Sequence, residues 1–245
     1  AAKDKSHEIE DSDITWRVMD GTLVIEGEGE MPDFVAPDFP EGAPWDARKG
    51  DISNATVAAG IAPLGTAAFA KCPAGQDKAV FFEDPAAIDL AAFVSGDGSV
   101  TNDFTAKQIL VPGADGGVTN AVKFLADTDP DAPRYDSIAE ALARDEVTKV
   151  TAYTLDGLKE LAETWISAEA GPQPWTERVA EAVTNAVIAI EGAADAESVR
   201  QAGIGGLNEI RTAQGEDETD PDLGGTIPGS GLTWKLVGGQ LVIEG

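Results

Sequence analysis

The chain has 245 residues, of which 42% are hydrophobic, so it is long and apolar enough to bury a core in one or two domains. Its 44 Asp and Glu outnumber its 17 Lys and Arg, and the net charge of -27 argues against nucleic-acid and membrane-surface binding. The sole cysteine, Cys72, excludes an intrachain disulfide and a cysteine-rich zinc site. The sole histidine, His7, lies in a charged run, where a Ser-His-Asp or Cys-His triad is not expected.

The N-terminal residues are mostly polar, and we expect residues 1–13 to form a flexible acidic tail. The start at Ala1 is compatible with removal of a signal peptide, and therefore with secretion. No run of about eighteen apolar residues occurs, so we expect no membrane insertion.

A β-hairpin is predicted at 14–27 (ITWRVMDGTLVIEG), where apolar and polar residues alternate on both sides of Asp20-Gly21. Residues 232–245 (LTWKLVGGQLVIEG) repeat this segment, with 8 of 14 residues identical at an offset of 218. We therefore expect a second hairpin at 231–245, the first of another copy, in a fragment of a longer tandem-repeat protein. This hairpin would either pack within its own chain or pair with a strand edge of another molecule.

A shorter repeat is predicted after the first hairpin. Residues 57–69 (VAAGIAPLGTAAF) align with 81–93 (FFEDPAAIDLAAF) at an offset of 24, so that Val57 coincides with Phe81 and Phe69 with Phe93. A period of 24 is typical of leucine-rich repeats, in which each unit supplies a short strand and a turn. Residues 107–112 (KQILVP) are the next predicted strand, and the hairpin is well placed to cap the stack.

Three segments of this region resemble the opening of BspA-like leucine-rich-repeat proteins of bacterial cell surfaces: GTLVIEGEGEMPDF, APWDARKGDI and ATVAAGIAPLGTAAFAKC. The residues that match the family's repeat pattern are Gly60, Ile61, Leu64, Gly65, Ala68, Phe69 and Cys72. The next unit departs from it, with Pro85 at a branched apolar position, Asp89 at the glycine and no cysteine after Phe93. The resemblance covers about residues 14–112 and implies a surface-exposed, non-catalytic repeat protein used for attachment or display.

Helix is predicted over the region 119–214, with a small helical bundle at about 154–214. Apolar residues recur there every three or four positions in three segments. Thr154 and Asp195 suit helix N-caps, Pro174 suits a first turn and Gly192 suits a helix end.

The same region also carries two finer signals and ends in a linker. The run Gly203-Ile-Gly-Gly indicates close helix packing or a kink. Residues of about 175–214 resemble the alanine-rich FIVAR-type helical spacer modules of Gram-positive surface proteins, which implies a stalk. Residues 215–230, rich in Gly, Pro and acids, are the predicted linker.

The sequence offers few candidates for chemistry. Asp127, Asp129 and Asp131 space carboxylates at alternate positions, as calcium loops do, and are the candidate metal ligands. Ala132 and Ile138 stand where an EF-hand needs Gly and Glu, so calcium is a possible cofactor only through a looser site. Cys72 is interpreted as a buried structural residue, and no catalytic or cofactor-binding residue is assigned.

Trp16, Trp234 and Trp45 are interpreted as core residues, whereas Trp175 is expected to be the most exposed tryptophan.

These patterns together predict an α+β fold: a β-hairpin cap, a short degenerate leucine-rich-repeat stack over 14–118, a helical bundle and a terminal hairpin. The function expected is that of a non-catalytic repeat unit of a secreted bacterial cell-surface protein, binding host matrix, mucin or another surface protein or glycan. Two alternatives stay open, a structural spacer without a ligand and a glycoside hydrolase that uses two carboxylates.

Overall fold

The protein is described here by a computed structural model, which describes residues 5–36, 38–39, 41–73, 78–86, 88–95, 108–217, 224–226, 233–237 and 240–244. The chain divides into two compact units, Ala1–Asp156 and Gly157–Gly245. Strands and helices are both abundant, so the fold is α+β, as predicted. No helix among the described residues is long and apolar enough to cross a bilayer.

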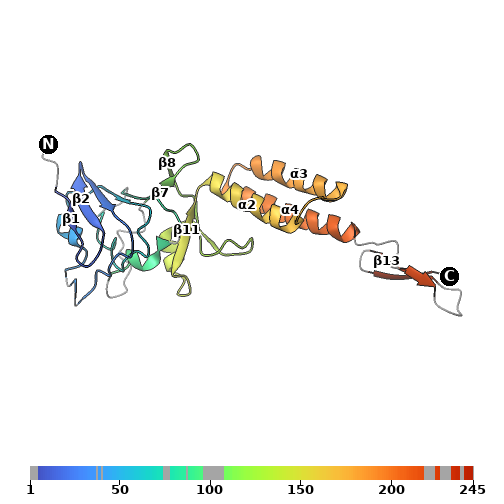
Figure 1. The fold of residues 1–245 in the computed structure, drawn as a ribbon, viewed down its shortest axis with the longest axis horizontal. Helices are drawn as coiled ribbons and strands as arrows, with labels where there is room; N and C mark the ends of the chain where they lie inside the picture. The colour runs from blue at the N-terminus through green and yellow to red at the C-terminus, as the bar shows by residue number, and fades with distance from the viewer. Residues whose placement is uncertain are drawn as a thin grey trace. The chain divides into compact units, whose positions relative to one another are not determined.

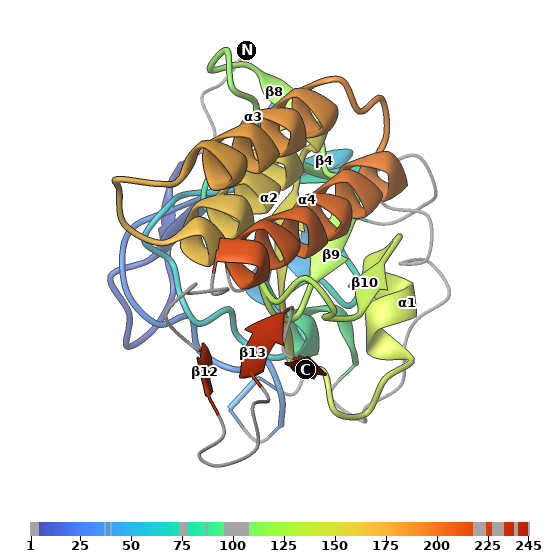
Figure 2. The ribbon, with the colours of Figure 1, turned by 90° about the vertical axis from the view of Figure 1, so that its right-hand side faces the viewer.

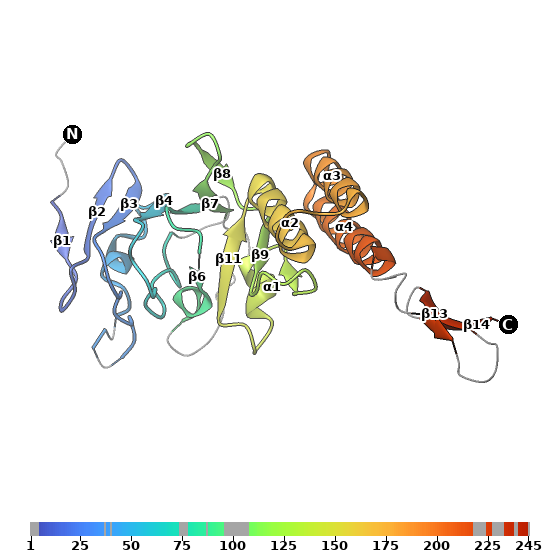
Figure 3. The ribbon, with the colours of Figure 1, turned by 45° about the vertical axis from the view of Figure 1, so that its right-hand side comes forward.

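The first unit contains a seven-stranded sheet in the order β1-β2-β3-β4-β5-β7-β8 (Figure 1). Its strands are β1 (His7–Glu8), β2 (Thr15–Met19), β3 (Thr22–Glu26), β4 (Asn54–Val57), β5 (Ala79–Phe82), β7 (Gln108–Pro112) and β8 (Val118–Asn120). The hairpin predicted at 14–27 is confirmed, since β2 and β3 pair antiparallel. From β3 through β4 and β5 to β7 all pairings are parallel, and β8 returns antiparallel (Figure 3).

The hairpin turn and strands follow from local residue chemistry. Asp20 and Gly21 both have positive φ, 49° and 79°, which is the backbone of a two-residue turn that matches strand twist. Burial alternates along β2, β3, β4 and β7, because successive side chains of a strand point to opposite faces. The sheet therefore has one core face and one outer face.

Residues 5–13 belong to the folded unit, so the prediction of a flexible tail is wrong for them. Strand β1 pairs with β2, and the His7 ring stacks on Trp16 with 4.7 Å between centroids. Ile9 is fully buried, and its backbone N–H donates to the Ile14 carbonyl. A short apolar anchor inside the acidic run was the overlooked signal.

Stacked aromatic rings form the centre of the core. Trp45, in the 3-10 helix η1 (Pro44–Arg48), stacks on Phe69 with 6.5 Å between centroids. Phe69 stacks in turn on Phe93, in the 3-10 helix η2 (Leu90–Phe93), at 5.7 Å. The Trp45 indole N–H donates to the Ala68 carbonyl at 2.9 Å. The prediction that Trp16 and Trp45 are core residues is confirmed.

The 24-residue alignment holds in the turns and is wrong by one residue in the strands. Phe69 and Phe93 stack at that offset, whereas β4 pairs with β5 as Val57 opposite Phe82. Phe81 is therefore opposite Thr56, and its side chain is on the outer face instead of the core. The connection between strand and turn is one residue shorter after β5 than after β4, which the sequence alignment did not resolve.

A second sheet replaces helix in the segment 119–153, so the helix prediction is wrong there. Its strands are in the order β10 (Arg134–Tyr135), β9 (Lys123–Leu125), β11 (Lys149–Tyr153) and β6 (Ile88–Asp89). The only helix there is α1 (Ile138–Leu142), capped by the Ser137 hydroxyl, which accepts from the Glu140 N–H. Burial alternates along β11, and its pairing with the distant β6 is a long-range contact that helical spacing rules cannot detect.

The second unit contains three long helices, which lie side by side (Figure 2). They are α2 (Leu155–Ala170), α3 (Glu177–Glu191) and α4 (Ala196–Asp217). Asp195 caps α4 by accepting from the Ser198 N–H, and Gly192 ends α3, both as predicted. The expected first-turn position of Pro174 is wrong, because α3 begins at Glu177 with Thr176 as its N-cap.

Close packing explains two of the glycines of α4, Gly203 and Gly206. A β-carbon on Gly203 would lie 3.1 Å from the Trp165 ring of α2, and one on Gly206 would lie 2.4 Å from Ala186 of α3. Helix α4 therefore contacts both neighbouring helices through positions without side chains.

The C-terminal residues form a three-stranded antiparallel sheet. It contains β12 (Gly224–Thr226), β13 (Thr233–Val237) and β14 (Gln240–Glu244), in that order. The hairpin predicted at 231–245 is thus present, and β12 adds a strand that was not predicted. In the predicted linker 215–230, residues 215–217 end α4 and 224–226 form β12, and the remainder is outside the described residues.

Candidate functional site: the outer row of the sheet

One residue from each of six adjacent strands forms a continuous row on the outer face of the seven-stranded sheet. The pairings join Arg17 to Val24, Val24 to Thr56, Thr56 to Phe81, Phe81 to Leu110, and Leu110 to Asn120. We call these six residues the outer row. Five of the six are half-buried and Asn120 is exposed, so the row meets solvent along its length.

The outer row combines apolar and polar side chains. Val24, Phe81 and Leu110 are apolar, with Thr56 between Val24 and Phe81. The two ends of the row are the Arg17 guanidinium and the Asn120 amide. Strands lie about 4.8 Å apart, so six strands span ~24 Å. Aromatic side chains are enriched in protein–protein interfaces.

The Arg17 end of the row is fixed in place by an ion pair. Arg17 Nη1 lies 2.7 Å from Glu26 Oε2, and Nη2 donates to Oε1 at 3.0 Å. This bidentate contact holds the guanidinium flat on the sheet beside Val24.

A cavity of about 440 Å³ lies beside Asp46. Its wall also includes Phe34, Phe39, Gly42, Ala67, Ala70 and Lys71. Asp46 is buried, and its Oδ2 lies 3.7 Å from Lys71 Nζ. Burial raises the pKa of the Asp46 carboxyl, and the Lys71 ammonium and the Ala43 N–H offset only part of this.

The Asp46 side chain has little contact with solvent. Its Oδ1 is inaccessible and has no hydrogen-bond partner among the described atoms. The carboxylate lies directly over Gly42, where a β-carbon would be 2.5 Å from Oδ2. The Lys71 ammonium lies beside the carboxyl, and the arrangement positions the start of η1.

Asp89 stands where the repeat pattern that the sequence resembles has glycine, and its contacts explain the carboxylate. Its Oδ2 accepts from the Leu64 N–H at 2.8 Å, and its Oδ1 lies 3.3 Å from Lys149 Nζ. The carboxylate thus ties the preceding turn to β11. Gly65, one unit earlier, packs so closely on the Pro32 carbonyl that no side chain fits.

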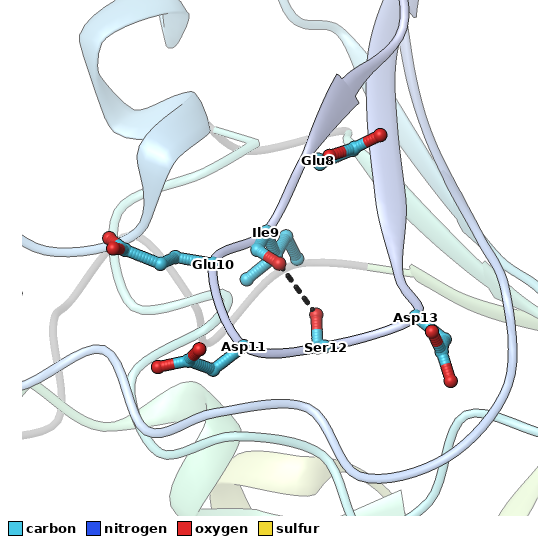
Figure 4. A pocket seen from close by; sticks show the side chains of 6 residues that line it. All are labelled: Glu8, Ile9, Glu10, Asp11, Ser12 and Asp13. Carbon is cyan, nitrogen blue, oxygen red and sulfur yellow. Dashed lines mark hydrogen bonds between the residues drawn. The ribbon is translucent and has the colours of Figure 1, made fainter.

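A third feature is the acidic turn at residues 8–13 (Figure 4). Its form is set by Ser12, whose hydroxyl donates to the Ile9 carbonyl at 3.0 Å. In Figure 4 the carboxylates of Glu10 and Asp11 lie on one side of the turn and that of Asp13 lies on the other. They form a solvated loop and not a converging set of ligands.

The predicted metal ligands use their oxygens locally. Asp127 Oδ1 accepts from the Thr128 N–H at 2.6 Å, and Asp129 Oδ1 accepts from the Asp131 N–H at 2.9 Å. Over the described ranges, no group of three or more His, Cys, Asp or Glu side chains is arranged to hold a metal ion. Asp127, Asp129 and Asp131 therefore do not stand out as a calcium site.

The structure also places the cysteine and two further tryptophans. Cys72 is fully buried, in keeping with its structural interpretation. Trp175 is half-buried, with its indole N–H donating to the Gly171 carbonyl, and Trp165 is buried. Sequence reasoning missed Phe81 and Leu110 of the outer row, because apolar residues on successive positions of β5 and β7 hide the two-residue period.

No protein-family model matches this chain, and searches of curated proteins and of solved structures find no match.

Proposed function

We propose that this chain is a non-catalytic repeat unit of a bacterial cell-surface protein, which acts in adhesion or display by binding protein or glycan. The observation that carries this is the outer row, in which Phe81 and Leu110 lie half-exposed on a rigid sheet between polar ends. The net charge of -27 favours a neutral or basic partner surface.

Two features support the architecture implied by the resemblance to BspA-like proteins. Strands β3, β4, β5 and β7 pair in parallel, and the turns that follow β4 and β5 stack through Phe69 and Phe93. We read this as a hairpin cap on a short, degenerate leucine-rich-repeat stack. Helices α2, α3 and α4 are read as a three-helix bundle that serves as a stalk.

Repetition supports an adhesive role on an extracellular surface. The hairpin sequence recurs after 218 residues, and several copies of one weak site bind a patterned surface more tightly than a single copy does. Host matrix, mucin and surface glycans present such repeated epitopes.

The test is an array of glycans and extracellular-matrix proteins, probed with and without calcium. We expect specific retention of the chain, and at least a tenfold loss for Phe81→Ser with Leu110→Ser. Ile188→Ser is the matched control, because Ile188 is an exposed aliphatic residue of α3, 62% accessible, and is not part of the outer row. Each variant is first shown to melt cooperatively.

Three results would decide against this proposal. Silence of the folded chain across the array favours the spacer, which has no ligand. Equal loss for Ile188→Ser and the row variant would mean non-specific hydrophobic adsorption. Release of cleaved sugar would favour the glycoside hydrolase.

A further inference from the structure

The two ends of the chain form sheets with the same strand register. In the first, Trp16 pairs with His7 on one side and Ile25 on the other. In the second, Trp234 pairs with Gly225 and with Ile243. Every one of these partners is displaced by 218 residues, so β12-β13-β14 repeats β1-β2-β3 strand for strand. The sequence repeat shows only two of these strands, because β12 and β1 share no residues.

Strand β3 uses its second edge to bind β4. The parallel pairs are Thr22 with Asn54, Leu23 with Ala55, Val24 with Thr56 and Ile25 with Val57. Backbone bonds extend this edge at both ends, from the Ser53 N–H to the Gly21 carbonyl and from the Ala58 N–H to the Ile25 carbonyl.

Strand β14 carries the same residues on the equivalent edge. TLVIE of β3 becomes QLVIE in β14, so three of the four residues that would face β4 are identical. Within the described residues, β14 pairs with β13 alone. A strand edge is a template for another strand, and because β14 has nearly the same residues as β3, the strand that it matches is β4.

We propose that β14 of one copy pairs in parallel with β4 of a second copy, in the register Gln240–Asn54, Leu241–Ala55, Val242–Thr56 and Ile243–Val57. The sheet β12-β13-β14 then occupies the position of the second copy's β1-β2-β3, and copies join head to tail by sheet exchange. Adhesive or other ligand binding is not required for this exchange.

The chain's own sheet β1-β2-β3 competes with the incoming sheet β12-β13-β14 for the edge of β4, and two features favour it. It is tethered to β4 by its own chain, which gives it a high effective concentration. It also holds the His7 ring stacked on Trp16, where the second sheet has Gly225. Replacing His7 by Gly removes that stacking from an exposed position, and so favours the incoming sheet without disturbing the core.

The test mixes two full-length variants, one with Thr56→Cys and one with Val242→Cys, in a thiol-disulfide buffer. A disulfide between residues 56 and 242 joins different chains by construction, and its position is checked by peptide mass mapping. Leu241→Cys mixed with Thr56→Cys is the matched control, because adjacent residues of a strand face opposite sides. A single chain with Val24→Cys and Thr56→Cys shows that position 56 reacts across the strand pair.

We expect at least tenfold more 56–242 than 56–241 heterodimer, rising with protein concentration. His7→Gly in the Thr56→Cys chain should raise the heterodimer several-fold. Equal yields for the two mixtures, or no heterodimer while the Val24–Thr56 control reacts, would overturn the exchange. A dominant Val242→Cys homodimer would also overturn it, since it would mean that β14 pairs with another β14.

Discussion

Gly65 lies against the carbonyl of Pro32, so close that a β-carbon on Gly65 would be 1.9 Å from the Pro32 oxygen. Backbone occupies this space, and it cannot yield as a flexible side chain does. We expect Gly65→Ala to cost about 3 kcal/mol of unfolding free energy, measured by urea denaturation. Gly50→Ala is the control, because a β-carbon there meets nothing within 4 Å. Similar midpoints for the two variants would contradict the close approach.

Adjacent glycines of α4 should respond in opposite directions to alanine. A β-carbon on Gly206 would lie 2.4 Å from Ala186 and 2.7 Å from Ile166, whereas one on Gly205 meets nothing. Gly205→Ala should stabilise the chain by ~0.5–1 kcal/mol through helix propensity. Gly206→Ala should destabilise it by about 1–3 kcal/mol through overpacking. Thermal melts that move in the same direction would show that α4 does not pack as described.

Asp46 should make stability fall as pH rises. Because burial raises its pKa, the native state keeps this proton at a pH where the unfolded chain has lost it. Stability from the protonated carboxyl is thus complete below the ordinary Asp pKa and is lost as pH rises through the raised native value.

Asp46→Asn keeps the shape and removes this titration. We expect the variant to melt about 2 °C above the wild type at neutral pH, with the difference vanishing under acidic conditions. A difference that is constant with pH, or largest in acid, would mean that burial does not dominate the Asp46 environment.

Asp89 should give the protein a higher unfolding free energy than the glycine that the repeat pattern has at its position. Asp89→Gly removes the acceptor for the Leu64 N–H and the partner of Lys149, and we expect a loss of about 2 kcal/mol. Asp89→Asn keeps an acceptor oxygen and should recover roughly half of this in chemical denaturation. Equal losses for the two variants would assign the effect to the ion pair instead of the hydrogen bond.

Local chemistry was readable from the sequence. The Asp20-Gly21 turn, the Asp195 cap and the end of α3 at Gly192 each depend on residues within a few positions, so their patterns predicted them. The stacking of Phe69 on Phe93 followed from the repeat, because equal spacing places equivalent side chains at successive levels.

Long-range pairing decided the rest. The strands in 119–153 exist because β11 pairs with β6 and β9, and such partners leave no short-range signal. One residue fewer between β5 and its turn moves Phe81 to the outer face, since a shift of one position reverses the side of the sheet.

The repeat of the terminal sheets depends on both local residue chemistry and long-range strand pairing. Identical residues in β3 and β14 were visible in the sequence, but the equivalence of β1 and β12 was not, since Gly225 and His7 share no chemistry. Backbone hydrogen bonds, which any residue except proline can make, fix that strand. The sequence therefore determined the hairpins, and only the tertiary structure placed a third strand on each and showed that β3 pairs with β4.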